Sequence, residues 1–225
     1  HKLLILASIA YGIDAKPEDI LIEGITDITQ EDIEFAKEFG YNLKLLGIAK
    51  KDKESVELRI HPTFLPQQAM IGKVDGVMNA ISVVGDSVGE TLFYGAGAGG
   101  DATASAVISD IIEIARTKSS PMLGFKTSIE KNLKLKPIAE IQSAYYLRII
   151  VLDKPGVLAQ ITTILGEEEI SIDTFLQRKS NNKNCSVLLL STHICTETKI
   201  QTALEKINNL EITQEKPIMI RIEKN

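Results

Sequence analysis

The chain has no tryptophan, only two cysteines and few aromatic residues of any kind. Two cysteines cannot build a disulfide scaffold. The fold of the 225 residues, 44% of them hydrophobic, must therefore be stabilised by a buried core. We place Cys185 and Cys195 on one strand, where about 3.3 Å per residue separates them by roughly 33 Å and leaves both as free thiols. Free thiols indicate a reducing cytoplasm.

Long apolar runs, a signal peptide and a basic surplus are also missing from this sequence. No apolar stretch approaches the roughly 18–20 residues of a membrane helix. The net charge of −5 disfavours nucleic acid as a partner, because phosphate binding needs basic patches. The three histidines are scattered without metal-ligand spacing, so we expect no metal site, and we expect His61 and His193 to be structural.

The chain opens without methionine, inside a helix over 2–11 that is apolar on nearly every side. Such a helix is normally buried all round, and we therefore expect a fragment of a longer protein. A second helix is expected after Thr29, which forms a capping box with Asp32. Its neighbouring acidic residues are expected to be solvated, and they are Glu18, Asp19, Glu31, Asp32 and Glu34.

Three parts are expected along the chain, and we expect an α+β fold. Residues 1–116 combine helices with a mixed sheet, with a loop bounded by Pro62 and Pro66 between two strand pairs. Residues 117–144 carry serines, prolines and alternating lysines and are interpreted as a linker. Residues 145–225 alternate strand, helix, strand, strand, helix and strand, the βαββαβ order of a ferredoxin-like unit.

The run Gly95-Ala-Gly-Ala-Gly-Gly100 is the most informative motif of the first part. Glycine lets a backbone approach a bulky anion, and a helix start offers free N–H groups. The turn can therefore contact a nucleotide, or it can be a tightly packed corner. Its spacing is not the G-x-G-x-x-G of dinucleotide-binding folds.

A second candidate site lies between the first strand and first helix of the βαββαβ unit. Gly156 lets the backbone approach a ligand, and the N–H groups of Val157 and Leu158 can receive a carboxylate. Asp153 can pair with an ammonium, and Gln177 on the neighbouring strand can donate and accept hydrogen bonds. Together these groups suit a free amino acid. The alternative is an ordinary turn with a helix cap and a surface glutamine.

Several segments in order along residues 1–116 resemble the C-terminal part of the substrate and dimerisation domain of homoserine dehydrogenase. Those segments are His1–Ser8, Gly24-Ile25, Leu45–Ala49, Arg59–Thr63, Gly76–Ala80, Phe93–Gly100 and Thr103–Ala106. Residues 145–223 resemble an ACT domain, an amino-acid-sensing module, through Asp153–Leu158 and Ile170–Ile172.

The resemblance implies an enzyme that interconverts L-homoserine and L-aspartate 4-semialdehyde with NADP or NAD, in threonine, methionine and isoleucine biosynthesis. It implies proton transfer by Lys2 and cofactor contacts by Gly97 and Gly99. Ala96 and Ala102 stand where the family often has prolines. The family's nucleotide-binding domain, its acidic substrate ligands and its metal site lie upstream of this chain, so we expect the chain alone to be inactive and not to bind the cofactor tightly.

The resemblance also implies feedback control through the ACT domain, with threonine as the expected effector, and a homodimer or homotetramer. The effector residues expected from it are Asp153, Gly156, Val157, Leu158 and Gln177. The first alternative is a stand-alone dimeric amino-acid-binding regulatory module. A further alternative is a non-enzymatic nucleotide-binding protein built on the glycine turn.

Overall fold

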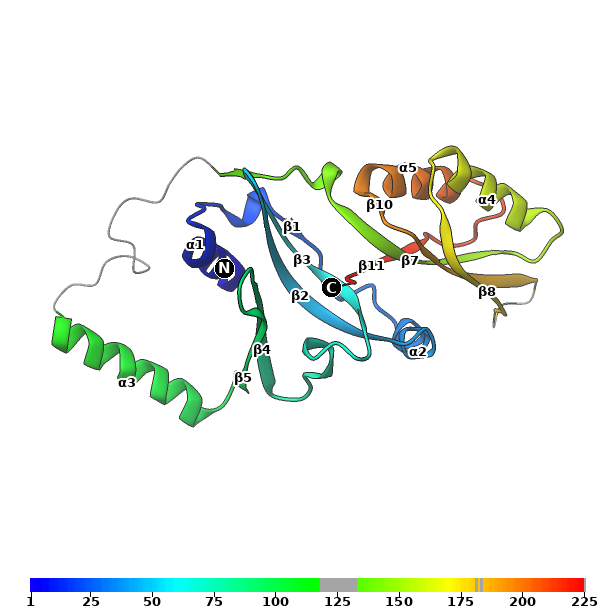
Figure 1. Cartoon of the computed structure of the whole chain (residues 1–225). Coiled ribbons are helices and arrows are strands. Elements are labelled where there is room, and N and C mark those ends of the chain that lie inside the picture. Colours follow the sequence, from blue (N-terminus) through cyan, green and yellow to red (C-terminus); the bar gives the residue numbers. More distant parts are fainter. Residues whose placement is uncertain (118–132, 181, 183, 225) are drawn as a thin grey trace.

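The structure, a computed structural model, describes residues 1–117, 133–180, 182 and 184–224. The predicted α+β class is confirmed (Figure 1). The helices are α1 (Lys2–Tyr11), α2 (Gln30–Glu38), α3 (Gly100–Thr117), α4 (Val157–Glu167) and α5 (Glu197–Asn208). The strands are β1 (Leu21–Ile22), β2 (Tyr41–Asp52), β3 (Ser55–Pro66), β4 (Met78–Gly85), β5 (Gly89–Ala96), β6 (Lys134–Leu135), β7 (Gln142–Leu152), β8 (Ile172–Lys179), β9 (Cys185–Thr192), β10 (Cys195–Thr196) and β11 (Ile218–Ile222).

The βαββαβ order predicted for the last part is present as β7, α4, β8, β9, α5 and β11. These strands lie side by side in the order β11-β7-β9-β8, and α4 and α5 cover one face of them. The core between this face and the helices is apolar because alternate strand residues meet the helix stripes there. Its buried members include Tyr145, Leu147, Ile149, Val157, Ile161, Leu190, Ile200, Ala203 and Ile207.

Helix α2, from the first part of the chain, covers the opposite face of the same strands. Ala36 is buried in a second core with Tyr146 and Leu189. Thr29 and Asp32 form the predicted capping box at the start of α2. The expectation that Asp32 is solvated is wrong: its side chain is fully buried, because it also pairs with Arg148 of β7.

Strand β3 joins the two parts of the chain into one nine-stranded sheet. It pairs with β2 along its whole length and, on its other edge, in parallel with β1 and then with β11. The loop expected at Pro62 is therefore wrong. The carbonyls of Ile60 and Phe64 both bond on the β1–β11 edge, to Glu23 and Glu223. Pro62 faces the same edge, in the gap between β1 and β11, where its missing N–H leaves no ladder bond unmade.

The linker predicted at residues 117–144 stays a prediction, and the parts of the chain on its two sides share this continuous sheet. Residues 118–132 lie outside the described part of the chain. The described end of the connection returns to the sheet as β6, which pairs with the start of β3. The last part is therefore tied to the first by the pairing of β11 with β3 and by the side-chain contacts of α2, and β6 ties the connection to β3.

Helix α1 lies on β2 and ends at Gly12 in the left-handed conformation, with φ 69°. The helix approaches closely at Gly47, where a Cβ would lie 3.4 Å from Leu3. The expectation that this helix is buried on every side is wrong. Leu4 and Ala7 are buried, whereas Ile5 and Ile9 on the other side are about half exposed.

The two cysteines do not share one strand, contrary to the sequence prediction. Strand β9 ends at Thr192, and Cys195 begins β10 after an exposed bend that contains His193. Cys185 pairs with Leu152 and Cys195 with Ser143, at opposite ends of β7, about 30 Å apart by the rise per residue. Both are free thiols, as expected. The two residues are far apart as the sequence predicts, although they lie on two strands and not on one.

Candidate functional site

The glycine-rich turn joins β5 to α3 and is exposed. Position 97 requires glycine because a Cβ there would lie 1.7 Å from Asn79 Nδ2. Its N–H donates to the Val77 carbonyl over 3.2 Å and ties the turn to the start of β4. Gly99 has φ 125°, and a Cβ there would meet nothing within 4 Å. Gly97 therefore makes room for Asn79, whereas Gly99 supplies the bend and leaves open space before α3.

Lys2 is the first residue of α1 and is exposed. In the described ranges, its ammonium makes no hydrogen bond or ion pair, and none joins it to Gly97 or Gly99. The structure therefore does not bring these three predicted residues into one constellation, and their roles stay predictions.

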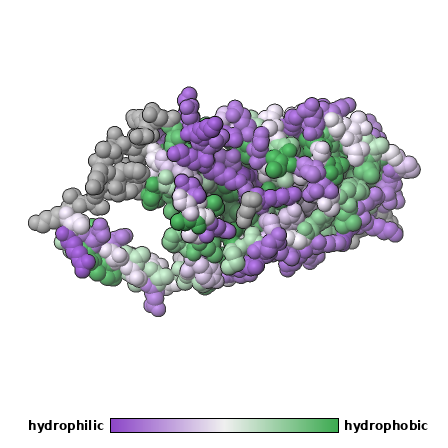
Figure 2. Space-filling view, in the orientation of Figure 1, coloured by the Kyte–Doolittle hydropathy of each residue, from purple (hydrophilic) through white to green (hydrophobic). Residues whose placement is uncertain are grey.

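Apolar side chains are exposed on α1, on the β4–β5 hairpin and on α3, near these candidates. Figure 2 shows hydrophobic residues among the hydrophilic ones on this side of the molecule. Contiguous exposed apolar surface commonly marks a contact with another body. Helix α3 has no buried residue at all. The large exposed residues are Ile5, Leu6, Ile9, Ile81, Val83, Val84, Val88, Phe93, Tyr94, Val107, Ile108, Ile111, Ile112 and Ile114.

All five residues proposed for amino-acid binding line one small cavity at the start of α4, which we call the cleft. Its volume is about 90 Å³. Its lining residues are Val151, Leu152, Asp153, Lys154, Gly156, Val157, Leu158, Gln177, Ser186 and Leu188. The cleft is far smaller than the roughly 300–1,000 Å³ of ligand pockets that enclose a drug-sized molecule. It has room to enclose only part of an amino acid.

The backbone at the start of α4 is arranged as the sequence predicts for a turn that a ligand can approach. Gly156 is the N-cap, with φ 88°, and contributes no side-chain cap bond. The first N–H groups of a helix lack partners within the helix and carry partial positive charge. Here the Val157 N–H donates to the Lys154 carbonyl over 3.4 Å, so one of the two N–H groups expected to receive a carboxylate already has a partner. The preceding turn is held in place because the Asp153 N–H donates to the Asn184 carbonyl over 2.8 Å.

Ser186 is a cleft residue that the sequence does not single out, because it stands in a strand of mostly apolar residues. Its side chain is buried, and its Oγ accepts a hydrogen bond from Gln177 Nε2 over 3.1 Å. The signal that could have found it is strand pairing. Lys179 faces Ser186 across the β8–β9 pair, so Gln177 lies diagonally across from it.

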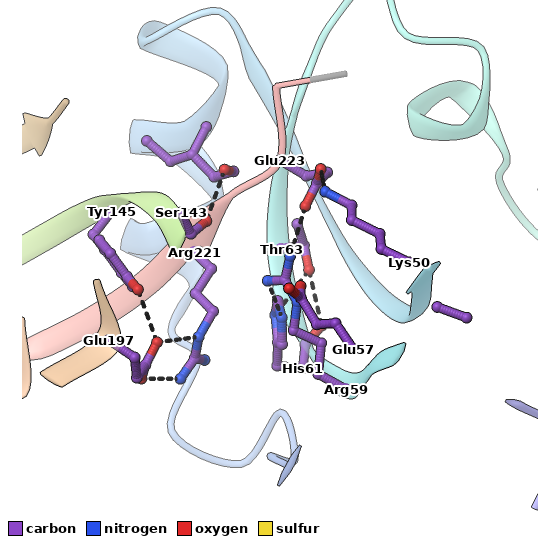
Figure 3. A network of polar contacts seen from close by, with 12 residues as sticks. Lys50, Glu57, Arg59, His61, Thr63, Ser143, Tyr145, Glu197, Arg221 and Glu223 are labelled. Atoms are coloured by element: carbon purple, nitrogen blue, oxygen red, sulfur yellow. Dashed lines mark hydrogen bonds and ion pairs between the residues drawn. The ribbon is translucent and has the colours of Figure 1, made fainter. Parts of the chain in front are cut away.

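A cluster of polar and charged groups lies where β11 meets β3, and we call it the junction cluster: Arg221, Glu197, Tyr145 and Glu23. Figure 3 shows the first three, which are buried, and the half-buried Glu23 binds Arg221 as well. The Arg221 side chain is 1% exposed and binds two carboxylates. Its Nη1 and Nη2 donate to Glu23 at 2.7 and 3.1 Å, and its Nε donates to Glu197 at 3.0 Å. The Tyr145 hydroxyl donates to Glu197 at 2.8 Å. Burial raises the pKa of Glu197, but the hydrogen bonds and charge of Arg221, together with hydrogen bonds from Gln201 and Tyr145, outweigh this, and the net pKa is lowered.

A second buried group of side chains adjoins it on β3 (Figure 3). Arg59 donates to Glu57 at 2.7 Å and to Glu223 at 3.0 Å. It also contacts His61 Nε2 at 3.0 Å, while His61 Nδ1 lies 2.9 Å from the Pro62 carbonyl. Burial, aided by the charge of Arg221, lowers the pKa of His61 to about 3. The ring is therefore neutral, with Nδ1–H donating to the carbonyl and Nε2 accepting from Arg59. The structural role expected for His61 fits this geometry.

In the described ranges of the chain, no cluster of three or more His, Cys, Asp or Glu residues is arranged to hold a metal ion. No helix in the same ranges has both the length and the apolar content needed to span a bilayer.

Comparison with known proteins gives two family matches. Residues 1–112 match the homoserine dehydrogenase family, and residues 145–212 match the ACT domain. A homoserine dehydrogenase of Helicobacter pylori is 59% identical over 223 residues, which cover 99% of this chain and 52% of the relative. A homoserine dehydrogenase of Pseudomonas aeruginosa is 41% identical over 230 residues, 53% of its length.

The fold has a solved counterpart. The crystal structure of a homoserine dehydrogenase from Thiobacillus denitrificans has a TM-score of 0.89 and 42% identity, covering 99% of this chain and 52% of that one. The chain thus spans about half the length of the relatives it matches. Taken together, these matches place residues 1–112 in the homoserine dehydrogenase family and residues 145–212 in the ACT-domain family.

Proposed function

We propose that the full-length protein containing this chain is a homoserine dehydrogenase. It interconverts L-homoserine and L-aspartate 4-semialdehyde with NADP or NAD, and this chain supplies a substrate and dimerisation segment and a regulatory ACT domain. The family match of residues 1–112, with a TM-score of 0.89 to a solved homoserine dehydrogenase, carries the proposal. The enzyme acts in the cytoplasm on the route to threonine, methionine and isoleucine.

Within this proposal, Lys2 transfers a proton to or from the substrate hydroxyl group. An ammonium does this when burial and neighbouring charges bring its pKa toward the working pH. The exposed position of Lys2 and the exposed side of α1 agree with a substrate site that another domain completes. A Lys2→Ala variant of the full-length enzyme is expected to lose kcat/KM by about 100-fold or more in a spectrophotometric assay of NADPH formation.

The nicotinamide cofactor fits the glycine turn at one of its two proposed contacts. Gly99 leaves open space in front of the N–H groups of the 18-residue helix α3, which suits a phosphate or another anionic group. Gly97 gives room to Asn79, so its contribution is to hold the shape of the turn. The cofactor supplies or accepts the hydride, and the residues of this chain form one wall of its site.

The 225-residue chain by itself is proposed to be inactive, since hydride transfer requires cofactor and substrate to be held against each other. The test compares NADP-dependent homoserine oxidation by the full-length protein and by this chain at equal concentration. Activity of the full-length protein without activity of the chain supports the proposal. Turnover by the chain alone would contradict it.

The cleft is proposed to bind the effector threonine. Its α-carboxylate lies at the N–H groups that begin α4, and its ammonium lies near Asp153 and Gln177. Because a cleft of about 90 Å³ encloses only part of this molecule, a second copy of the chain completes the site in a homodimer or homotetramer. Calorimetry with threonine tests this. Heat that disappears in a Gln177→Ala variant supports the site, whereas no heat at millimolar threonine contradicts it.

The second candidate function is a stand-alone amino-acid-binding module, supported by the ACT match and by the arrangement of the cleft. The two proposals differ in one measurement. Threonine binding with no dehydrogenase activity in the full-length protein would favour the binding module.

A further inference from the structure

The cleft and the first part of the chain are connected by side chains that are in direct contact. Val157 lines the cleft and is also buried in the core beneath α4. That core contains Ile161 of α4 and Ile200 of α5, and the two helices pack against each other. A shift of α4 caused by a ligand at its first turn must therefore be accommodated by α5, because close-packed interiors transmit strain.

Helix α5 begins at the junction cluster. Its first residue is Glu197, whose carboxylate is held by Arg221 at 2.5 and 3.0 Å and by the Tyr145 hydroxyl. The Glu197 backbone N–H also donates to the Ile141 carbonyl over 2.8 Å. Movement of α5 therefore changes the position of a buried carboxylate on a buried guanidinium.

On its other side, Arg221 grips the first part of the chain. Glu23 takes two hydrogen bonds from this guanidinium, and its own N–H donates to the Ile60 carbonyl of β3 over 2.8 Å. Glu23 therefore extends the β1–β3 ladder by one bond and carries the charge that meets Arg221. Among the described side chains, Arg221 thus connects the start of α5 to the backbone beside β3.

We propose that the junction cluster transmits effector occupancy of the cleft to residues 1–66, so that regulation passes through the sheet and not through the connecting segment. This rests on the proposed function, because it assumes that the cleft binds an effector. The cleft end of β7 at Leu152 and the cluster at Tyr145 are about 23 Å apart along the strand. Packed side chains and ion-pair networks carry energetic coupling over such distances.

Electrostatics explain why this cluster is sensitive to small displacements. A guanidinium that is 1% exposed is stabilised by its two carboxylates and not by water. Bidentate geometry depends on the planes of both groups, so a small displacement of Glu197 weakens its own bonds and changes the share held by Glu23. The Glu23 side chain is 38% exposed, which makes it the member that can be changed at least cost to the fold.

The test uses the full-length enzyme and measures the inhibition factor, the ratio of kcat/KM for homoserine without threonine to that with saturating threonine. Glu23→Gln removes the charge that crosses the junction and keeps the shape. We expect it to bind threonine in calorimetry as the unchanged protein does, with an inhibition factor about 2- to 30-fold smaller. Asp27→Asn, an exposed carboxylate in the same segment, is the matched control and is expected to keep the full factor.

A second arm tests the connecting segment. A protease site inserted between Ser119 and Ser120 is cut after purification, and we expect the two pieces to remain associated and the inhibition factor to persist. An unchanged factor in Glu23→Gln, loss of its threonine binding, or loss of inhibition after the cut would each overturn the proposal. If the unchanged enzyme neither binds threonine nor is inhibited by it, the proposed effector is wrong, and this inference is wrong with it. That result is observed in the unchanged enzyme, so it is distinct from the results that overturn only this inference, which are observed in Glu23→Gln or after the cut.

Discussion

The buried pair of Asp32 and Arg148 gives the sharpest prediction about stability. Arg148 donates to Asp32 at 2.7 and 3.3 Å, and the two side chains are 8% and 0% exposed. Asp32 also accepts from the N–H and the hydroxyl of Thr29. This carboxylate therefore caps α2 and fixes that helix to the face of the β7–β9 strands.

Removing one member of a buried ion pair costs about 3–5 kcal/mol, because the remaining charge is left without water or a partner. Asp32→Asn keeps an amide oxygen for the cap, so its cost isolates the lost charge, and we expect about 3 kcal/mol. Arg148→Met leaves the fully buried Asp32 carboxylate with only its Thr29 bonds, so we expect a cost of about 3 kcal/mol here as well. The double variant leaves no unpaired charge, so its cost should fall below the sum of the two by about 1–3 kcal/mol.

The assay is urea unfolding followed by far-UV circular dichroism, since the chain has no tryptophan to report by fluorescence. Glu31→Gln is the matched control, because it removes an exposed carboxylate from the same first turn of α2. We expect the control to change the free energy of unfolding by less than about 1 kcal/mol. The reasoning is refuted if Asp32→Asn costs no more than this control, or if the two single costs simply add.

Three further predictions follow from the other sites. Ser186→Ala should weaken threonine binding by about 5-fold and leave valine binding unchanged, since a buried hydroxyl is worth about 1 kcal/mol to a hydrogen-bonding ligand. Calorimetry with both amino acids checks this, and equal weakening of the two would contradict it. Gly97→Ala should raise the KM for NADP in the full-length enzyme, because the new Cβ would displace Asn79, and an added Asn79→Ala should restore it; failure of that rescue would show that Gly97 matters for another reason. His61 has a lowered pKa of about 3 in the folded chain against about 6.5 when unfolded, so the unfolded state binds the extra proton between these values. Stability should therefore fall by on the order of 1 kcal/mol per pH unit from pH 6.5 down toward pH 3, and His61→Gln should remove that part of the slope in urea titrations at several pH values; an unchanged slope would contradict the assignment.

Local patterns in the sequence predicted most of the elements. The capping box of Thr29 and Asp32, the left-handed Gly12 after α1 and the order of the βαββαβ unit depend on residues near one another in the chain. Four of the five cleft residues were also predictable as neighbours, because a strand end and the helix that follows it must lie together. Gln177 reaches the cleft from β8, which is separated from β7 by β9. The roles of Lys2, Gly97 and Gly99 stay predictions, since no contact among the described residues tests them.

Contacts between distant segments escaped prediction. Pro62 looked like the edge of a loop, yet it continues β3 because β1 ends and β11 begins on either side of it. Asp32 looked like a solvated helix residue, because no pattern near it in the sequence indicates that Arg148, far along the chain, donates a hydrogen bond to its carboxylate. Cys195 looked like the end of a long strand, but the chain leaves the sheet at His193 and returns beside Ser143.

The sequence by itself determined the family of each part, the class of fold and the place of the cleft, because these follow from motifs and periodicities within short windows. Only the tertiary structure decided that the two parts share one sheet and that Arg221 binds Glu23 and Glu197 between them. Residues so far apart in the chain meet only when the whole sheet is assembled. The burial that makes their charges matter exists only in the folded molecule.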